Sequence, residues 1–314
     1  MADVETMKAI RYHSHGGPEV LELERVERPQ AAGGEVLVKV HAIGVNPGDW
    51  QIRSGLAGDT FPLPYIPGWD VSGVVAAVGP DASLYREGEA VYGMTANSGA
   101  CAEYVVIPES QLARKPESLS HLQAAAVPMS AFTAWHALVK QGQLTTGQTV
   151  LIHGASGGVG HFAVQIAKLL GAKVIGVASG RNQAFLRELG ADECIDYTVT
   201  PLTQLPGIAD LVLDTVGGPE GDTLLAVLKP GGRLVPVTYG HYSADKAAEL
   251  SIDVQDVRLL QIATADLERI GQWFDEDRLR VYIDTVVPLE ETRQAHERSE
   301  SRRARGKIVV QVIP

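Results

Sequence analysis

The pattern of apolar and polar residues divides the chain into two parts. From about residue 8 to residue 125, short β-like runs such as 35–42 and 71–78 are interrupted by Gly and Pro. Pairs such as Gly33-Gly34 are typical turn signals between strands. This pattern predicts a compact, β-rich, barrel-like domain rather than a parallel sheet.

The second part begins after an Ala-rich stretch of helical spacing over residues 121–140, where we place the crossing between domains. Beyond it, apolar runs of strand length alternate with runs of helical spacing. Strands are predicted at 149–153, 173–177, 193–196, 209–214, 233–237 and 257–262, and helices at 162–170, 182–189, 222–228 and 265–274. This alternation predicts a doubly wound parallel sheet, with a ligand at the carboxyl ends of its strands.

A glycine-rich turn connects the first of these strands to the first helix. The segment 153–160 reads His-Gly-Ala-Ser-Gly-Gly-Val-Gly. Glycines allow the backbone to approach a pyrophosphate, and the N–H groups of the first helical turn point at it. In this strand-to-helix context, the turn predicts a dinucleotide-binding site.

The end of the second strand bears on the choice of cofactor. An NAD site places Asp or Glu there, whereas this strand continues into Ser179, Gly180 and Arg181. A hydroxyl and a guanidinium would bind a 2′-phosphate that a carboxylate would repel, so the sequence favours NADPH over NADH. The alternative is that Ser179 caps a helix and Arg181 is a surface charge.

Two loops of the first part mix Gly and Pro with amide, carboxylate and Trp side chains, as a rigid pocket rim would. They cover residues 44–55 and 62–70. The alternative is that Asn46 and Asp49 only cap turns. Neither loop contains Cys or His, and the chain has no Cys pair at metal-binding spacing, so we expect no zinc.

The net charge of -11 argues against binding to nucleic acid or to an anionic membrane surface. The basic cluster at 298–305 is a local exception, which we interpret as a solvated helix end, with a cofactor-phosphate role as the alternative. Cys101 and Cys194 are too few for a disulfide framework. No signal peptide or membrane-spanning run is evident, so we expect a soluble, cytoplasmic protein without membrane contact.

These segments together resemble the zinc-free quinone oxidoreductase branch of the medium-chain dehydrogenase/reductase family, which includes zeta-crystallin and the plant enone reductases. The resemblance covers nearly the whole chain. Its most specific pieces are Gly44-Val45-Asn46-Pro47, the glycine turn 153–160, Leu189-Gly190-Ala191-Asp192, Asp214-Thr215-Val216-Gly217-Gly218 and Leu228-Lys229-Pro230-Gly231-Gly232.

The resemblance implies a GroES-like catalytic domain over residues 1–126, completed by 281–314, with a Rossmann domain over 127–280 between them. Zinc-dependent relatives have Cys at the position of Asn46 and His at that of Trp69, so both ligands are replaced here. Relatives pair as homodimers through edge strands of the Rossmann sheet, and the predicted strand 257–262 is the candidate edge.

The family's cofactor contacts transfer to matching positions of this chain. Ser156, Gly157, Gly158 and Val159 would bind the pyrophosphate, and Ser179 and Arg181 the 2′-phosphate. Tyr197 would stack on the adenine. The residues expected near the nicotinamide or elsewhere along the cofactor are Asn46, Thr133, Val216, Tyr239 and Lys307.

We therefore predict hydride transfer from NADPH to a quinone or to an α,β-unsaturated carbonyl, acceptors that need little help from a Lewis acid. Side-chain donors would stabilise the developing enolate. The candidate catalytic residues are Asn46, Asp49 and Tyr239, and the candidate pocket residues are Trp50, Tyr65, Trp69, Tyr92 and Tyr242. Tyr239 is the best placed Tyr because its loop directly follows a strand; any single Tyr can instead be a packed wall residue.

Two other functions stay open on the sequence alone. The enoyl reductase modules of polyketide synthases resemble the same branch, so an enoyl thioester is an alternative acceptor. Many quinone reductases also have Tyr where this chain has Gln51, so a Tyr proton donor cannot be assumed there. This departure favours the second alternative, a structural or regulatory protein that binds NADPH without turnover.

Overall fold

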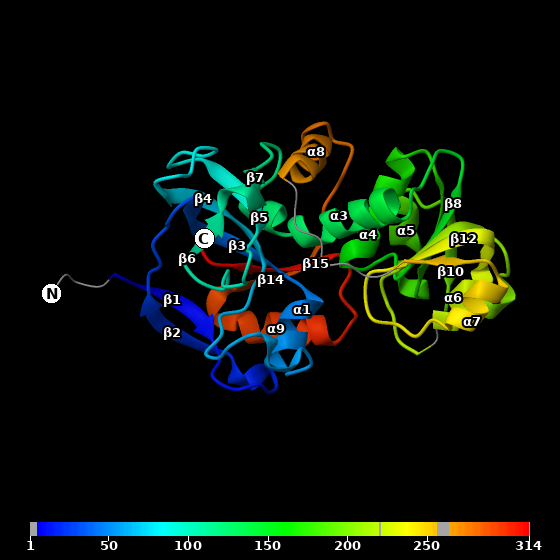
Figure 1. Cartoon of the computed structure of the whole chain (residues 1–314), viewed down its shortest axis with the longest axis horizontal. Helices are drawn as coiled ribbons and strands as arrows, with labels where there is room; N and C mark the ends of the chain where they lie inside the picture. Colours follow the sequence, from blue (N-terminus) through cyan, green and yellow to red (C-terminus); the bar gives the residue numbers. More distant parts are fainter. Residues whose placement is uncertain (1–4, 220, 256–263, 314) are drawn as a thin grey trace. The chain divides into compact units, whose positions relative to one another are not determined.

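The computed structural model describes residues 5–219, 221–255 and 264–313 (Figure 1). By its internal contacts the chain divides into two compact units. One comprises Met1–Met129 and Gln261–Pro314, and the other comprises Ser130–Leu260. Each unit has its own sheet and its own apolar core.

The first unit contains a seven-stranded sheet in the order β14-β15-β3-β4-β5-β7, with β6 also paired to β3, and a separate antiparallel pair β1-β2. All neighbours in the large sheet are antiparallel except β14 and β15. The strands are β1 (Thr6–Arg11), β2 (Glu22–Glu27), β3 (Glu35–Val45), β4 (Asp70–Val78), β5 (Ala90–Met94), β6 (Tyr104–Pro108), β7 (Leu112–Arg114), β14 (Ile283–Pro288) and β15 (Lys307–Gln311). The helices are α1 (Pro47–Arg53), α2 (His121–Ala125), α8 (Thr264–Asp275) and α9 (Thr292–Glu300). The predicted β-rich architecture is confirmed.

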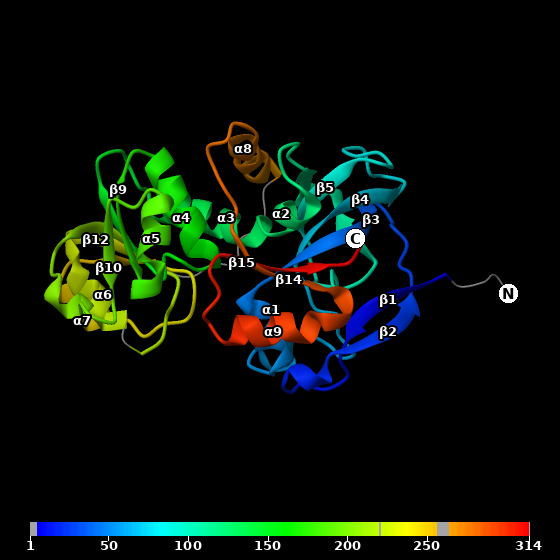
Figure 2. The ribbon, with the colours of Figure 1, turned by 180° about the vertical axis from the view of Figure 1, so that it is seen from behind.

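The last strand of this unit positions the functional residues. β15 lies between β14 and β3, and its register pairs Ile308 with Val45, the last residue of β3 (Figure 2). Apolar side chains of β3 such as Val38 and Ile43 are fully buried in the core of the unit. The register places Lys307, the first residue of β15, beside the loop that follows β3.

The second unit contains a six-stranded parallel sheet in the order β10-β9-β8-β11-β12-β13. The strand order reverses between β8 and β11, as in a doubly wound fold, so the predicted architecture is confirmed. The strands are β8 (Thr149–His153), β9 (Lys173–Ala178), β10 (Glu193–Asp196), β11 (Ala209–Asp214), β12 (Leu228–Pro236) and β13 (Asp253–Val254). The helices are α3 (Pro128–Trp135), α4 (Gly158–Leu169), α5 (Gln183–Glu188), α6 (Gly221–Val227) and α7 (Ala244–Glu249).

Two details of these elements differ from the sequence prediction, and a third prediction is not tested. The predicted helical stretch 121–140 is divided before Pro128, because the residue that precedes a proline disfavours helical backbone, and it ends in a π-helical turn at His136–Gln141. β12 begins at Leu228 rather than at residue 233, and its pairing with β11 shifts register before Arg233. The predicted strand 257–262 lies outside the described residues.

Helix α8 packs against β7 of the first unit. The N–H and the hydroxyl of Ser118 both donate to the Asp275 carboxylate, and the Tyr92 hydroxyl donates to the carbonyl of Leu267. The division by contacts therefore assigns α8 to the first unit, whereas the sequence prediction assigned it to the Rossmann domain. Across the described part of the chain, no helix has the length and apolar character needed to cross a membrane.

Candidate functional site

The loop after β3 holds Asn46 and Asp49 at the buried start of α1. Asn46 has an extended backbone, and Pro47 occupies the first helical position, which needs no N–H donor. The Asp49 carboxylate accepts hydrogen bonds from the N–H of Asn46 at 2.8 Å and from the N–H of Gly68 at 3.1 Å. Asp49 thus caps the turn, as the alternative interpretation proposed, and also connects the two loops singled out in the sequence.

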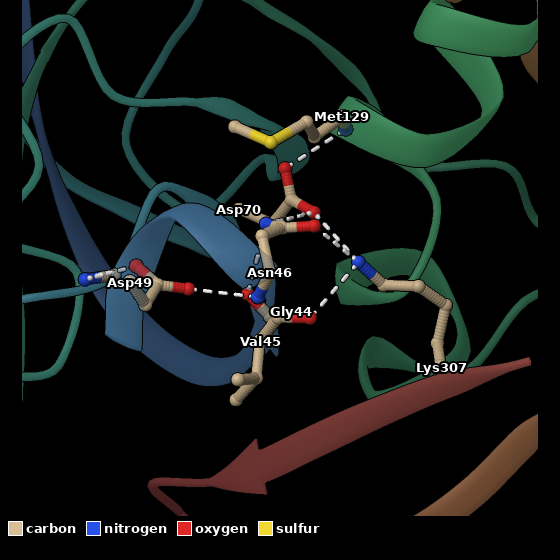
Figure 3. Close-up of polar contacts among 8 residues, drawn as sticks. Gly44, Val45, Asn46, Asp49, Asp70, Met129 and Lys307 are labelled. Atoms are coloured by element: carbon tan, nitrogen blue, oxygen red, sulfur yellow. Dashed lines mark hydrogen bonds and ion pairs between the residues drawn. The ribbon is translucent and has the colours of Figure 1, made fainter. Parts of the chain in front are cut away.

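The Asn46 side chain belongs to a buried polar cluster formed by Asn46, Asp49, Asp70 and Lys307, here called the Lys307 cluster (Figure 3). Asn46 Nδ2 donates to Asp70 Oδ2 at 3.0 Å, and Asn46 Oδ1 accepts from Lys307 Nζ at 2.6 Å. Lys307 Nζ also contacts the Val45 carbonyl at 3.2 Å and Asp70 Oδ2 at 3.4 Å. The ammonium therefore has three acceptors within its own unit, and its contact with the cofactor stays a prediction.

One buried cation in this cluster faces two buried carboxylates. Burial raises the pKa of Asp49 to about 7, although the hydrogen bonds from Asn46 and Gly68 act in the opposite direction. Burial also raises the pKa of Asp70, against the lowering effects of Lys307 and Asn46. Asp49 can therefore exchange a proton near neutral pH.

This shift predicts a particular pH dependence of stability. Asp49 keeps its proton in the folded chain up to about pH 7, whereas its reference pKa is 3.8. The folded state therefore binds more protons between these values, and the contribution of Asp49 to the free energy of unfolding falls as the pH rises. Chemical denaturation of the wild type and Asp49→Asn from about pH 4 to pH 8 should show that the wild type loses stability relative to the variant.

Asp284 provides a control of opposite sign. Burial would raise its pKa, but hydrogen bonds from Arg298 and from the N–H of Arg305 outweigh burial and lower the pKa to about 2. Its contribution is lost only as the pH falls from 3.8 to about 2, so the wild type should lose stability relative to Asp284→Asn in that range. From about pH 4 to pH 8, the difference between wild type and Asp284→Asn should stay constant, in contrast to Asp49→Asn. A stability difference between wild type and Asp49→Asn that does not change with pH would contradict the assignment.

The aromatic candidates of this unit have different environments. Phe61 packs edge-on against Trp69, with ring centroids 6.0 Å apart, and against the buried Tyr65 at 5.5 Å. The guanidinium of Arg302 lies 5.8 Å from the ring of Trp50. Tyr92 is fully buried and its hydroxyl donates to a backbone carbonyl, so the packed-wall alternative describes Tyr92 best.

In the second unit, the turn between β8 and α4 depends on glycine. Gly154 has φ +78°, and a Cβ there would overlap Thr215 Oγ1 and lie 2.8 Å from Val216 Cγ2. A Cβ on Gly160 would lie 2.7 Å from the Cα of Ala155. Helix α4 begins at Gly158, and the N–H groups of its first turn have no acceptor within the helix. These N–H donors fit a pyrophosphate. The predicted contacts Ser156, Gly157, Gly158 and Val159 lie in this turn, and their binding to a pyrophosphate stays a prediction.

Asn182, which the sequence analysis did not single out, connects this glycine turn with the loop after β9. Its Nδ2 donates to Ser156 Oγ at 3.0 Å and lies 3.4 Å from Ser179 Oγ. Ser179 makes no side-chain capping bond to the short helical turn that follows it, and Arg181 is exposed. The two serines assigned to the pyrophosphate and to the 2′-phosphate are therefore held by one amide.

Asp196, at the end of β10, is a carboxylate near this loop that the sequence analysis also missed. It accepts hydrogen bonds from the N–H of Thr198 at 3.0 Å and from its hydroxyl at 2.7 Å. These bonds, together with one from the N–H of Gly180, lower the pKa of Asp196. A negative charge thus lies beside the position proposed for the 2′-phosphate.

Exposed side chains follow β10, at one edge of the parallel sheet, and the two neighbouring strands β11 and β12. Tyr197 after β10 is 56% exposed, Val216 after β11 is 46% exposed, and Tyr239 after β12 is 93% exposed. Thr133 lies half-buried on α3. Tyr242 differs from Tyr239, because its hydroxyl donates to the buried carboxylate of Asp214 at 2.6 Å.

In the first unit, the structure brings together Asn46, Asp49 and Lys307. In the second unit, it brings together the glycine turn and the loops after β9 and β11. Asp70 and Asp214 were not among the residues predicted for these sites. Each had a signal: Asp70 ends the second loop that was singled out, and Asp214 ends a predicted strand at the carboxyl edge of the sheet.

No group of three or more His, Cys, Asp or Glu side chains suited to a metal ion is found among residues 5–219, 221–255 and 264–313. The zinc-free site remains a prediction from the sequence. Where zinc-dependent relatives are expected to carry Cys, Asn46 instead binds a lysine ammonium.

Comparison with known proteins places this architecture in a family. Residues 32–117 match the alcohol dehydrogenase GroES-like domain, and residues 189–310 match a domain described as zinc-binding dehydrogenase. A quinone oxidoreductase of Sus scrofa is 35% identical, with 97% of each chain covered. A chloroplastic NADPH-dependent alkenal/one oxidoreductase of Arabidopsis thaliana is 33% identical over 98% of this chain and 80% of the relative.

A solved structure of the quinone oxidoreductase from Coxiella burnetii has a TM-score of 0.89 and 35% identity. The match covers 98% of this chain and all of the other, so it includes both units. The GroES-like and Rossmann architecture, the glycine-turn cradle and these relatives agree with one another. The chain therefore belongs to the quinone oxidoreductase branch of the medium-chain dehydrogenase/reductase family and is an NAD(P)-dependent oxidoreductase.

Proposed function

We propose that this protein reduces a quinone or an α,β-unsaturated carbonyl with NADPH. The observation that carries the proposal is the glycine turn between β8 and α4, whose first-turn N–H groups form an open anion cradle. The names of the quinone and alkenal/one oxidoreductase relatives support these acceptor classes. When bound, NADPH supplies a hydride to the acceptor.

The residues of the Lys307 cluster would act on the acceptor's oxygen. Asn46 Nδ2 donates one hydrogen to Asp70 Oδ2, at an N···O distance of 3.0 Å, and the other to the carbonyl of Gly44, at a longer N···O distance of 3.4 Å. This second N–H is a suitable donor to a developing oxyanion. Lys307 and Asp49 would fix the orientation of Asn46, through its side chain and its backbone respectively. Tyr239 stays a second candidate donor because its side chain is exposed.

Ser179 and Arg181 support NADPH as the cofactor, whereas the carboxylate of Asp196, which its hydrogen bonds keep ionised, acts against a 2′-phosphate. Ser179→Asp is expected to weaken NADPH binding by more than about tenfold, or about 1.4 kcal/mol, because the new carboxylate would repel the 2′-phosphate. NADH has no such phosphate and is the control, since its dissociation constant should change little. Calorimetry with both cofactors makes the measurement. An unchanged dissociation constant for NADPH would reject the assignment.

The proposed reaction can be tested by following NADPH oxidation with three acceptors: a 1,4-benzoquinone, an alkenone and an enoyl-CoA thioester. Turnover with the quinone or the alkenone supports the proposal. Turnover with the thioester alone would favour the enoyl reductase alternative. Tight NADPH binding without turnover of any acceptor would instead favour a protein that binds the cofactor for a structural or regulatory purpose.

We also propose that the protein is a cytoplasmic homodimer. The edge predicted to pair, residues 257–262, lies outside the described residues, so the proposal rests on the family resemblance. The Arabidopsis relative is named as chloroplastic, so related proteins occupy other compartments. Size-exclusion chromatography with light scattering tests the dimer, and a monomeric mass would reject it.

A further inference from the structure

The carboxylate of Asp214 receives hydrogen bonds from the end of β8, from the loop after β11 and from the loop after β12. Oδ1 contacts His153 Nδ1 at 2.9 Å and accepts from the N–H groups of Val216 at 2.9 Å and Gly217 at 3.1 Å. Oδ2 accepts from the Tyr242 hydroxyl at 2.6 Å. Burial would raise the pKa of Asp214, but these donors lower it, so the group is ionised and His153 Nδ1 carries the proton.

The same three segments contact one another directly. Thr215 Oγ1, in the loop after β11, donates to the carbonyl of His153 at 2.7 Å, which joins it to the glycine turn after β8. On its other side, the N–H of Gly218 donates to the carbonyl of Tyr239 at 3.0 Å, and the N–H of His241 donates to the carbonyl of Gly218 at 2.9 Å. The loop after β11 is therefore held between its two neighbours.

The ring of Tyr242 has a defined place in this arrangement. A Cβ on Gly221 would lie 2.6 Å from the ring, and a Cβ on Gly240 would lie 2.6 Å from Tyr242 Cζ. Any larger residue at these two positions would displace the ring and its hydrogen bond to Asp214. Tyr242 is a predicted pocket residue, whereas in the structure its hydroxyl donates to Asp214.

We propose that Asp214 is a positioning residue of the cofactor site, which sets the loops after β8, β11 and β12 in the arrangement that binds NADPH. The inference rests on the proposed function, because it takes the glycine turn, Val216 and Tyr239 as cofactor contacts. The Asp214 side chain is only 1% exposed, so it acts through these loops and not by touching the cofactor.

A purely structural role is the competing explanation, and the same strand offers a matched control. Asp210 lies at the opposite end of β11, where its carboxylate accepts from the N–H of Thr149 at 2.8 Å and from Lys229 Nζ at 2.9 Å. Asp210→Asn removes a carboxylate bonded to both backbone and side chain, as Asp214→Asn does. It leaves the loops at the carboxyl edge in place.

The test measures the NADPH dissociation constant by calorimetry, steady-state kinetics with a quinone, and the melting temperature. Asp214→Asn is expected to raise the dissociation constant and KM for NADPH about tenfold. The KM for the quinone should stay within about twofold of the wild-type value. Tyr242→Phe, which removes one donor, should raise the NADPH dissociation constant about threefold. Asp210→Asn should lower the melting temperature and leave NADPH binding unchanged.

Equal NADPH affinity of Asp214→Asn and Asp210→Asn would overturn the inference. If Asp214→Asn does not fold, Tyr242→Phe decides, and an unchanged dissociation constant in that variant rejects a positioning role. The two failures can be distinguished. A wild-type protein that binds no NADPH would refute the proposed function. A wild type and a variant that bind NADPH equally well would refute only the positioning role.

Discussion

Lys307→Met is expected to lower the free energy of unfolding by about 3–5 kcal/mol, because it leaves the carboxylate of Asp70 buried without its cation. The two side chains are 3% and 0% exposed, so water cannot replace the lost ammonium. Asn46 would also lose its partner at Oδ1, so we expect quinone reduction to fall sharply even in the protein that remains folded. Chemical denaturation and steady-state kinetics measure the two effects.

Lys168→Met is the matched control for this variant. Lys168 pairs with Asp192, but their side chains are 35% and 36% exposed, so this pair contributes about 0–1 kcal/mol. Protonation of Asp70 would relieve the unpaired charge in Lys307→Met, so its loss of stability should be smaller at about pH 5 than at about pH 8. Equal, small losses in both variants would show that the buried pair does not stabilise the fold.

Gly154→Ala is expected to weaken NADPH binding by about a hundredfold, or about 2.8 kcal/mol. Gly154 has φ +78°, and its added Cβ would overlap Thr215 Oγ1 and press on Val216. The turn must move to relieve this overlap, and its movement displaces the N–H groups at the start of α4 from the pyrophosphate. Calorimetric titration with NADPH measures the loss.

Gly147→Ala separates this overlap from backbone strain. Gly147 has φ +86° and lies just before β8, but a Cβ there would have no atom within 4 Å. Both variants therefore carry a left-handed alanine, which costs about 1–2 kcal/mol of stability. Only Gly154→Ala should lose affinity for NADPH. An equal loss of affinity in both variants would contradict the close packing of the glycine turn.

Local patterns were sufficient to predict most of the parallel sheet. Strand β8, the glycine turn and α4 are contiguous, and their apolar spacing and small residues are determined within a single segment of the chain. The end of α5 was predicted for the same reason, because Gly190 has φ +97° just beyond the last helical turn. The start of β12 was not predicted, since Lys229-Pro230-Gly231-Gly232 has the composition of a turn and joins the sheet only through pairing with β11.

The sites were less accessible to sequence reasoning because their members lie far apart in the chain. Lys307 and Asn46 are 261 residues apart and meet only through the register of β15 on β3. The family resemblance suggested Lys307 as a functional residue, but nothing local indicated that its partners are Asn46 and Asp70. Spacing alone likewise did not show that the hydroxyls of Tyr92 and Tyr242 are engaged within their own units.

The insertion of β15 between β14 and β3 also determines an order of events during protein synthesis. The segment 130–260, which holds every described strand of the parallel sheet, leaves the ribosome before residues 307–311, so this sheet can form while the chain is still growing. Residues 42–45 of β3 keep an unpaired edge until β15 arrives, and such an edge can pair with other chains. The nascent chain therefore acquires the cation that balances Asp70 only when translation has passed residue 307.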